Sequence, residues 1–173
     1  MTLWEIDIHP AKDQPDRAGA RIASAARELG LAPNLSVAAA RGYLVQGESL
    51  ERGQIERLAR ELLADVVVER TVIGHAGEPH LSEPSDCGLR IADCGLTDRS
   101  SNPKFEIRNP KSVVTVLLKP GVMDPVAQSA QAAAADLGIK VEAVATLHKY
   151  WIGNATPAEI KAVSERLLAN DAI

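Results

Sequence analysis

One stretch of the sequence decides the fold, residues 112–170, which reads SVVTVLLKPGVMDPVAQSAQAAAADLGIKVEAVATLHKYWIGNATPAEIKAVSERLLAN. Residues 3–65 have the same layout. The matched residues lie 108, 107 or 105 positions apart, and the offset changes only between periodic segments, where turns are expected. The matched pairs are Asp16 and Asp124, Leu29-Gly30-Leu31 and Leu137-Gly138-Ile139, Tyr43 and Tyr150, Ile55 and Ile160, and Leu62–Asp65 and Leu167–Asn170. The chain therefore carries an internal duplication, and a repeat decides the fold before any motif does.

The first unit, residues 1–73, is predicted to be β-α-β-α-β. Hydrophobic periodicity predicts strands at 4–9, 35–46 and 66–73, the last because Val66-Val67-Val68 and Thr71-Val72-Ile73 are rich in β-branched residues. It predicts helices after Pro15 and over 51–64. The residues expected to face the core from the first helix are Ala18, Ile22, Ala25 and Leu29.

The second unit, residues 112–173, repeats the plan. A strand is expected at 113–118 and another at 140–152. One helix begins at Asp124-Pro125, and the next at a capping box formed by Thr156 and Glu159. The residues expected to face the core from the first of these helices are Val126, Ala130, Ala133 and Leu137. The predicted fold class is α+β, with two tandem units, antiparallel sheets covered by helices on one face, and a pseudo-twofold axis.

Only Asp171-Ala172-Ile173 follow the last helix, so the second unit is expected to lack its final strand. Three residues span about 10 Å, which is too short to complete a sheet of matching width. An unpaired edge invites association with another chain. We therefore expect either that the natural polypeptide continues past Ile173 with a Val/Ile-rich strand, or that another copy or a partner fills the edge.

Residues 74–111 are predicted to be a linker, because they are rich in Gly, Pro, Ser, Asp and Asn and show no sustained period. Short strands or surface contacts are expected at 89–91 and 105–107. Four residues with metal-binding side chains fall in the linker, but their spacing lacks the close pairs of a zinc site, so no metal is predicted. They are His75, His80, Cys87 and Cys94.

The composition excludes several classes of protein. Apolar residues make up 46% of the 173-residue chain, enough for a core, while aromatic residues are only 3%. A net charge of −4 gives no basic surface for nucleic acid. No apolar run approaches the roughly 20 residues of a membrane span. The N-terminus lacks a secretory pattern, and two cysteines make no disulfide framework, so we expect a cytoplasmic protein.

Two segments are candidate binding sites. Lys119-Pro120-Gly121-Val122-Met123-Asp124 joins a strand to a helix N-terminus, a junction that can hold an anion. A tight turn with a capped helix explains the same residues. His148-Lys149-Tyr150-Trp151 is either a contact surface or a buried tryptophan with its partner. No catalytic constellation, phosphate loop or cofactor motif stands out.

The motif Lys119-Pro120-Gly121-Val122-Met123-Asp124-Pro125 resembles the PurS family, and Leu167-Leu168-Ala169-Asn170 is similar to the end of that family's second helix. The resemblance covers almost all of the second unit. The first unit is a weaker copy, with Lys12 and Asp16 but no Gly-Val between them. Arg41-Gly42-Tyr43 and His148-Lys149-Tyr150 each keep only part of the family's Arg-x-Gly-Lys strand signature.

The resemblance implies a non-catalytic accessory subunit or domain of phosphoribosylformylglycinamidine synthase, the ATP- and glutamine-dependent ligase of de novo purine biosynthesis. It implies bridging of the synthetase (PurL-type) and glutaminase (PurQ-type) subunits and support of ammonia transfer. No cofactor is expected, and self-association is a further expected interaction. The binding or assembly residues it implies are Lys119, Gly121, Val122, Asp124, Pro125, Lys149 and Tyr150. The alternative function is a regulatory α+β module that senses a small molecule, with the Gly121 turn at the interface holding the ligand.

Overall fold

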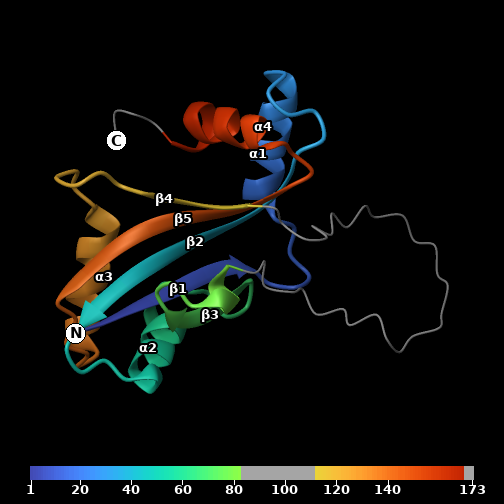
Figure 1. Cartoon of the computed structure of the whole chain (residues 1–173). Coiled ribbons are helices and arrows are strands. Elements are labelled where there is room, and N and C mark those ends of the chain that lie inside the picture. Colours follow the sequence, from blue (N-terminus) through green and yellow to red (C-terminus); the bar gives the residue numbers. More distant parts are fainter. Residues whose placement is uncertain (83–111, 170–173) are drawn as a thin grey trace.

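The described residues form a five-stranded antiparallel sheet with the strand order β3-β1-β2-β5-β4 (Figure 1). The computed structural model describes residues 1–82 and 112–169. The strands are β1 (Thr2–Pro10), β2 (Ser36–Gly47), β3 (Glu69–His75), β4 (Ser112–Leu117) and β5 (Ala143–Gly153). The α+β prediction is confirmed, but the described strands form one continuous sheet rather than two.

In the described part of the chain, four α-helices cover the sheet. Two of them are seven residues long, and each of these continues into a five-residue π-helix. They are α1 (Arg17–Glu28), α2 (Arg52–Leu58) with η1 (Ala59–Leu63), α3 (Pro125–Asp136), and α4 (Pro157–Val163) with η3 (Ser164–Leu168). A short 3₁₀ helix, η2 (Pro79–Leu81), follows β3. We call residues 1–82 the first unit and residues 112–169 the second. Corresponding helices in the two units have equal lengths.

The two units meet at β2 and β5. These strands pair from Ser36 opposite Gly153 to Gln46 opposite Ala143. β1 flanks β2 on one side of this junction, and β4 flanks β5 on the other. The first unit then adds β3 outside β1, whereas among the described residues no strand lies outside β4. The described second unit is therefore β-α-β-α rather than β-α-β-α-β.

All four helices pack on one face of the sheet. On β2, the core residues Val37, Tyr43 and Val45 all occupy odd positions, which point to the same side of a strand. Each of the two core clusters combines both units. One joins Ile55 and Leu58 of α2 to Ala134 of α3, and the other joins Ala26 of α1 to Val163 of α4, which lie side by side in Figure 1. Each unit therefore completes its core with a helix of the other.

The first helix of each unit is rotated relative to the prediction. Gly19 and Ala26 are buried in α1, whereas Ala18 and Leu29 are exposed. In α3, Ala127, Ala130 and Ala134 are buried and Val126 is 55% exposed. The cause is the capping residue: the Asp16 and Asp124 carboxylates bond both to the helix and to the neighbouring strand, which turns the first helical turn toward the sheet.

The end of the first unit also differs from the prediction. Val66-Val67-Val68 form an exposed turn, and β3 begins only at Glu69. The predicted linker boundary at residue 74 is too early, because β3 runs to His75 and Leu81 of η2 is buried. The predicted segments at 89–91 and 105–107, together with Cys87 and Cys94, lie outside the described residues.

Candidate functional site

The junction between β4 and α3 brings together five of the seven predicted binding residues. Lys119, Gly121 and Val122 form a turn in which the Val122 N–H donates to the Lys119 carbonyl at 3.0 Å. Gly121 has a φ of +90°, a conformation that side-chain-bearing residues rarely adopt. Asp124 caps α3, and Pro125 is the first helical residue.

Asp124 acts as a clamp between the helix and the sheet. Its Oδ1 accepts a hydrogen bond from the Ala127 N–H at 2.9 Å, and its Oδ2 accepts from the Thr146 N–H and hydroxyl at 2.9 and 2.7 Å. Desolvation by itself raises the pKa of Asp124, but the bonds from Ala127 and Thr146 outweigh it and hold the pKa below its ordinary value. Asp16 repeats the arrangement in the first unit, accepting from the Gly19 and Ala39 N–H groups at 2.8 and 2.7 Å.

This clamp favours the capped turn over an anion site at the junction. The Asp124 carboxylate already occupies the Ala127 N–H, one of the free helix N-terminal donors that an anion would need. The surroundings are apolar instead. The exposed large hydrophobic residues at this junction are Leu117, Leu118, Val122, Met123 and Val126. The junction therefore presents the chemistry of a protein contact surface.

Lys149 and Tyr150, the other two predicted binding residues, do not form one patch. They are neighbours on β5, so their side chains point to opposite faces of the sheet. Tyr150 packs on the helix side, against the cluster of α1 and α4, and burial raises the pKa of its hydroxyl. Lys149 is 4% exposed and lies on the face without α-helices. The two side chains therefore do not form one contact surface, and their assignment as binding residues stays a prediction.

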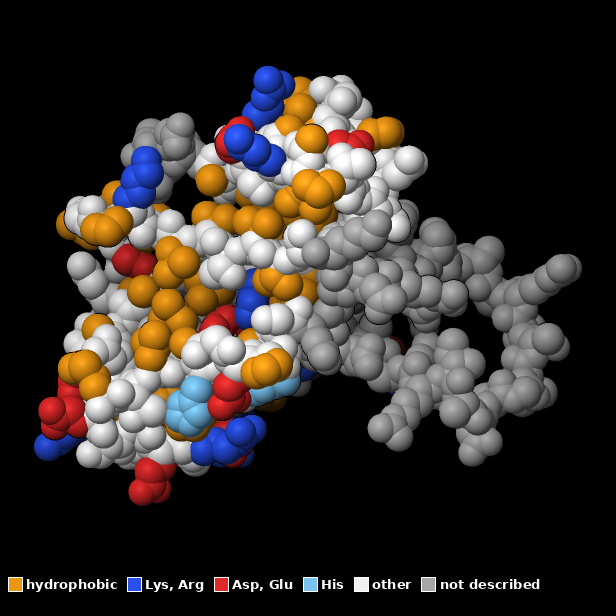
Figure 2. All heavy atoms as spheres, viewed as in Figure 1, with side chains coloured by type: hydrophobic (Ala, Val, Ile, Leu, Met, Phe, Trp, Pro, Cys, Tyr) orange, Lys and Arg blue, Asp and Glu red, His pale blue; other side chains and the backbone are white. Residues whose placement is uncertain are grey.

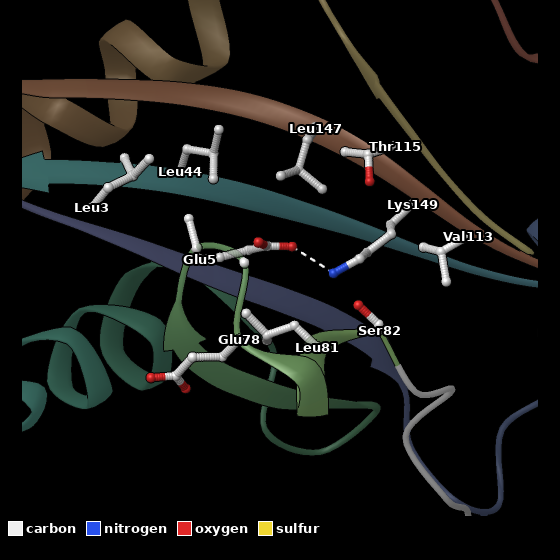
Figure 3. Close-up of a pocket in the computed structure, with 12 residues that line it drawn as sticks. Leu3, Glu5, Leu44, Glu78, Leu81, Ser82, Val113, Thr115, Leu147 and Lys149 are labelled. Atoms are coloured by element: carbon white, nitrogen blue, oxygen red, sulfur yellow. Dashed lines mark hydrogen bonds and ion pairs between the residues drawn. The ribbon is translucent and has the colours of Figure 1, made fainter.

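Lys149 belongs instead to a buried polar cluster on the open face of the sheet. Its Nζ donates to Glu5 Oε1 of β1 at 2.5 Å, across the small residues of β2 (Figure 3). It also donates to Asp7 Oδ2 of β1 at 2.9 Å. The His9 ring lies 5.0 Å from the ring of Trp151, centroid to centroid. Trp151 is 1% exposed and donates to the Ser82 carbonyl at 3.1 Å, so the buried-tryptophan interpretation of residues 148–151 is confirmed.

Burial shifts two pKa values in this cluster in opposite directions. Desolvation raises the pKa of Asp7 to about 6, although the Lys149 ammonium opposes the shift. Desolvation, helped by the positive charges of Arg70 and Lys149, lowers the pKa of His9 to about 4. Asp7 Oδ1 is buried without a hydrogen-bond partner. The sequence predicts Lys149 as a binding residue but not Glu5, Asp7 or His9, whose only signal is that they alternate with apolar residues on a strand.

A cleft of about 370 Å³ opens above this cluster. Both units line it, with Glu5 and Leu44 on one side and Leu147, Lys149 and Thr115 on the other, and the segment from Ala76 to Ser82 closes one wall (Figure 3). The predicted ligand-holding turn at Gly121 does not line the cleft. The cleft offers one cation, carboxylates and leucine side chains, a set suited to binding rather than to bond breaking.

The described residues contain neither a candidate metal site nor a helix that could span a membrane. No group of three or more His, Cys, Asp and Glu side chains in residues 1–82 and 112–169 is arranged to hold a metal ion. His75 packs against Trp4, with ring centroids 4.0 Å apart, and the His80 Nδ1 lies 3.2 Å from Glu78. None of the described helices has the length and apolar character needed to cross a bilayer.

The second unit matches a known protein family. Residues 111–173 match the family model of PurS, described as phosphoribosylformylglycinamidine (FGAM) synthase. No curated protein matches the chain. The matched segment includes the Asp124 clamp and all the predicted binding residues. It also includes β4, α3, β5 and α4. The match covers 63 of the 173 residues, so residues 111–173 are similar to the PurS family of FGAM synthase.

Proposed function

We propose that the chain is a non-catalytic accessory component of FGAM synthase in which two PurS-like units on one polypeptide take the place of a PurS dimer. The observation that carries the proposal is the family match to residues 111–173, whose helix lengths and Asp124 clamp recur in the first unit. The first unit, residues 1–73 with its extension to Ser82, is the second PurS-like repeat in this proposal, and the residues that follow connect it to residue 112.

The packing of the units supports a covalently joined pair. α2 of the first unit shares a core with α3 of the second, and α1 shares a core with α4. Within residues 1–82 and 112–169, the ion-pair partners of the buried Lys149 of β5 are Glu5 and Asp7 of β1. Such shared cores are typical of obligate dimers, and placing both halves on one chain removes the concentration dependence of their association.

In this proposal the chain bridges the synthetase (PurL-type) and glutaminase (PurQ-type) subunits or domains, supports ammonia transfer between them, and works in the cytoplasm. A bridging role needs contact surfaces rather than a reaction centre. The exposed apolar junction around Val122 and Met123 is one such surface. The titratable cluster of Lys149, Glu5 and Asp7 is buried and mutually paired, which suits structure better than catalysis.

The test is reconstitution with purified subunits. The tagged chain is mixed with the synthetase and glutaminase subunits, and the complex is analysed by gel filtration and by glutamine-dependent FGAM formation. We expect one complex containing all three proteins, and no ATPase or glutaminase activity from the chain alone. Failure to bind either subunit, or turnover by the pure chain that a single point change abolishes, would contradict the proposal.

The cleft favours a second candidate, a regulatory module that binds a small molecule between its units. About 370 Å³ is enough for an amino-acid-sized ligand, and its lining combines Lys149 and Glu5 with Leu44 and Leu147. A thermal-shift screen with amino acids and nucleotides separates the candidates. Stabilisation by one amino acid, lost on changing Leu147 to a bulkier Phe that narrows the cleft, would favour the sensor.

A further inference from the structure

Lys149, Glu5 and Asp7 form a charge cluster that crosses the junction between the two units. Lys149 lies on β5 of the second unit, and both carboxylates that pair with it lie on β1 of the first unit. All three side chains are at most 10% exposed. Figure 2 shows hydrophobic side chains over the middle of this side of the molecule and most charged side chains toward its margins. Pairing of the units is therefore coupled to a balance of buried charge.

The corresponding positions of the two units differ in chemistry. In the first unit, Asp7 of β1 faces Gly42 of β2, and in the second unit, Thr115 of β4 faces Lys149 of β5. The two pairs correspond under the predicted repeat, because Asp7 and Thr115 are 108 positions apart and Gly42 and Lys149 are 107 apart. At these positions the first unit has a carboxylate and no lysine, and the second unit has a lysine and no carboxylate. The two units are therefore complementary rather than interchangeable.

The neighbouring position of the register shows the same kind of difference. Leu44 faces Glu5 in the first unit, and Trp151 faces Val113 in the second. The indole N–H of Trp151 donates to the Ser82 carbonyl of the first unit at 3.1 Å, a bond that a leucine side chain cannot make. A second contact across the junction, which involves no charge, therefore also requires one unit of each kind.

The backbone register of the junction would also fit two units of the same kind. Arg41 of β2 faces His148 of β5, and these residues are 107 positions apart, so they are counterparts at the centre of the junction. Two first units paired in this register would bury Glu5 and Asp7 of both copies with no lysine beside them. Two second units would bury Lys149 of both copies with no carboxylate. A buried charge without its partner is costly, and such a cost against the wrong partner gives an interface its specificity.

We propose that the charge cluster selects the partner of each unit, so that a first unit pairs along β2 only with β5 of a second unit and pairing of like units is excluded. The selection acts in the same way whether the two unlike units belong to one chain or to two chains. When many identical chains fold together, it directs each first unit to a second unit. The selection does not depend on the role in FGAM synthase, because it requires only the two units and this cluster.

The test divides the charges between two full-length chains with different affinity tags. Lys149→Met leaves the carboxylates without a cation, and the double variant Glu5→Gln, Asp7→Asn leaves the lysine without an anion. When the two chains are refolded together from urea and exchange units, one junction regains the original cluster and the other contains only uncharged side chains. Residues 83–111, which join the units, have a contour length of roughly 100 Å, which permits the exchange. We expect a 1:1 complex that carries both tags.

The control is a mixture of the wild type with the triple variant Glu5→Gln, Asp7→Asn, Lys149→Met. In each of these chains the cluster is balanced without exchange, while the rest of the sequence is the same as in the test mixture. Association through any other surface therefore contributes equally to both mixtures. The complex with two tags should be at least about tenfold more abundant in the test mixture. Equal amounts in the two mixtures would overturn the proposal, whether or not the separate variants fold alone.

A crosslink identifies the strands that meet in this complex. Gln46 of β2 faces Ala143 of β5. In chains with Cys87 and Cys94 changed to Ser, Gln46→Cys is added to the Lys149→Met chain and Ala143→Cys to the double variant. Mild oxidation should then form a disulfide between the two chains, because these residues meet only where unlike units pair. A complex with two tags that lacks this disulfide would overturn the proposal.

A second cysteine position reports the excluded pairing. His148 faces Arg41 when unlike units pair. Two paired second units would instead place residue 148 of one chain opposite residue 148 of the other. His148→Cys in both chains of the test mixture should therefore give no disulfide-linked dimer. A dimer as abundant as the one linked through residues 46 and 143 would show that like units pair, which would also overturn the proposal.

Discussion

Lys149 Nζ lies 2.9 Å from Asp7 Oδ2, so a lysine of the second unit neutralises a carboxylate of the first across the intervening strand β2. Both side chains are at most 5% exposed. Glu5 completes the set, with Oε1 2.5 Å from the same nitrogen. The cluster therefore connects β1 of the first unit to β5 of the second unit, on the face opposite the apolar cores.

The first prediction concerns this lysine. Lys149→Met leaves Glu5 and Asp7 buried without a counter-charge, and breaking a buried pair in this way costs about 3–5 kcal/mol. Urea denaturation should show that loss in the free energy of unfolding. Adding Glu5→Gln and Asp7→Asn should recover part of it. Lys161→Met is the control, because the Lys161–Glu165 pair is exposed and should change stability by less than about 0.5 kcal/mol. Equal losses in the two single variants would contradict a buried role for Lys149.

The second prediction concerns pH, and it follows from the opposite shifts of Asp7 and His9. The pKa of Asp7 is raised from 3.8 to about 6, so the folded state holds that proton more tightly, and stability falls as pH rises through this window. The pKa of His9 is lowered from 6.5 to about 4, so the unfolded state takes up that proton more readily, and stability rises with pH across nearly the same window. Each shift is on the order of 3 kcal/mol, and the two largely cancel.

Single variants should uncover the two opposing effects. Asp7→Asn removes the contribution to stability that falls as pH rises. The stability of this variant should therefore rise from pH 4 to pH 6.5 more steeply than that of the wild type. His9→Gln removes the contribution to stability that rises with pH. The stability of this variant relative to the wild type should therefore fall over the same pH range. The measurement is urea denaturation at several pH values in one buffer system. Parallel pH profiles for all three proteins would show that the shifts are absent.

The third prediction compares two glycines inside helices. A Cβ at Gly19 would lie 2.3 Å from the Val37 carbonyl oxygen and 2.6 Å from Asp16 Oδ2, so Gly19 allows α1 to approach β2 and its cap. Nothing lies within 4 Å of a Cβ at Gly53 in α2. Gly19→Ala should therefore cost about 1–3 kcal/mol through overpacking. Gly53→Ala should increase the free energy of unfolding by about 0.5–1 kcal/mol, because alanine has the higher helix propensity. Thermal unfolding measures both, and a stabilised Gly19→Ala would show that α1 can move away from the strand.

The predicted internal repeat made much of this fold predictable from the sequence. Two copies of one pattern located four helices and the main strands, and the matched Asp16 and Asp124 located the start of a helix in each unit. The repeat also matched Gly30 to Gly138, and both have positive φ. What it could not supply was the packing between copies, because shared cores and the continuous β2–β5 pairing depend on contacts between residues about a hundred positions apart.

Local competition explains the remaining differences. Val66-Val67-Val68 have strong strand propensity, yet Asp65 Oδ1 accepts from the Val67 N–H at 2.9 Å and the Asp65 carbonyl accepts from the Val68 N–H at 3.1 Å. This aspartate turn takes the backbone groups that a strand would need. On β5, alternation alone could not show that Lys149 would find its carboxylates on β1, two strands away.

The last prediction tests the β4–α3 junction and rests on the function proposed above. Gly121 has a φ of +90° with open space where a Cβ would stand, so Gly121→Val strains the backbone without a clash. Gly30, after α1, has a φ of +64° and is equally open, which makes Gly30→Val the matched control for that strain. Both variants should lose stability to a similar extent, on the order of 1–2 kcal/mol. Only Gly121→Val should weaken binding to the synthetase and glutaminase subunits, because it displaces the turn that carries Lys119, Val122 and Met123. Binding by gel filtration and stability by urea denaturation are measured on the same preparations. Equal binding by the two variants would show that the junction is not the assembly surface, and complete unfolding of Gly121→Val alone would show that its role is structural.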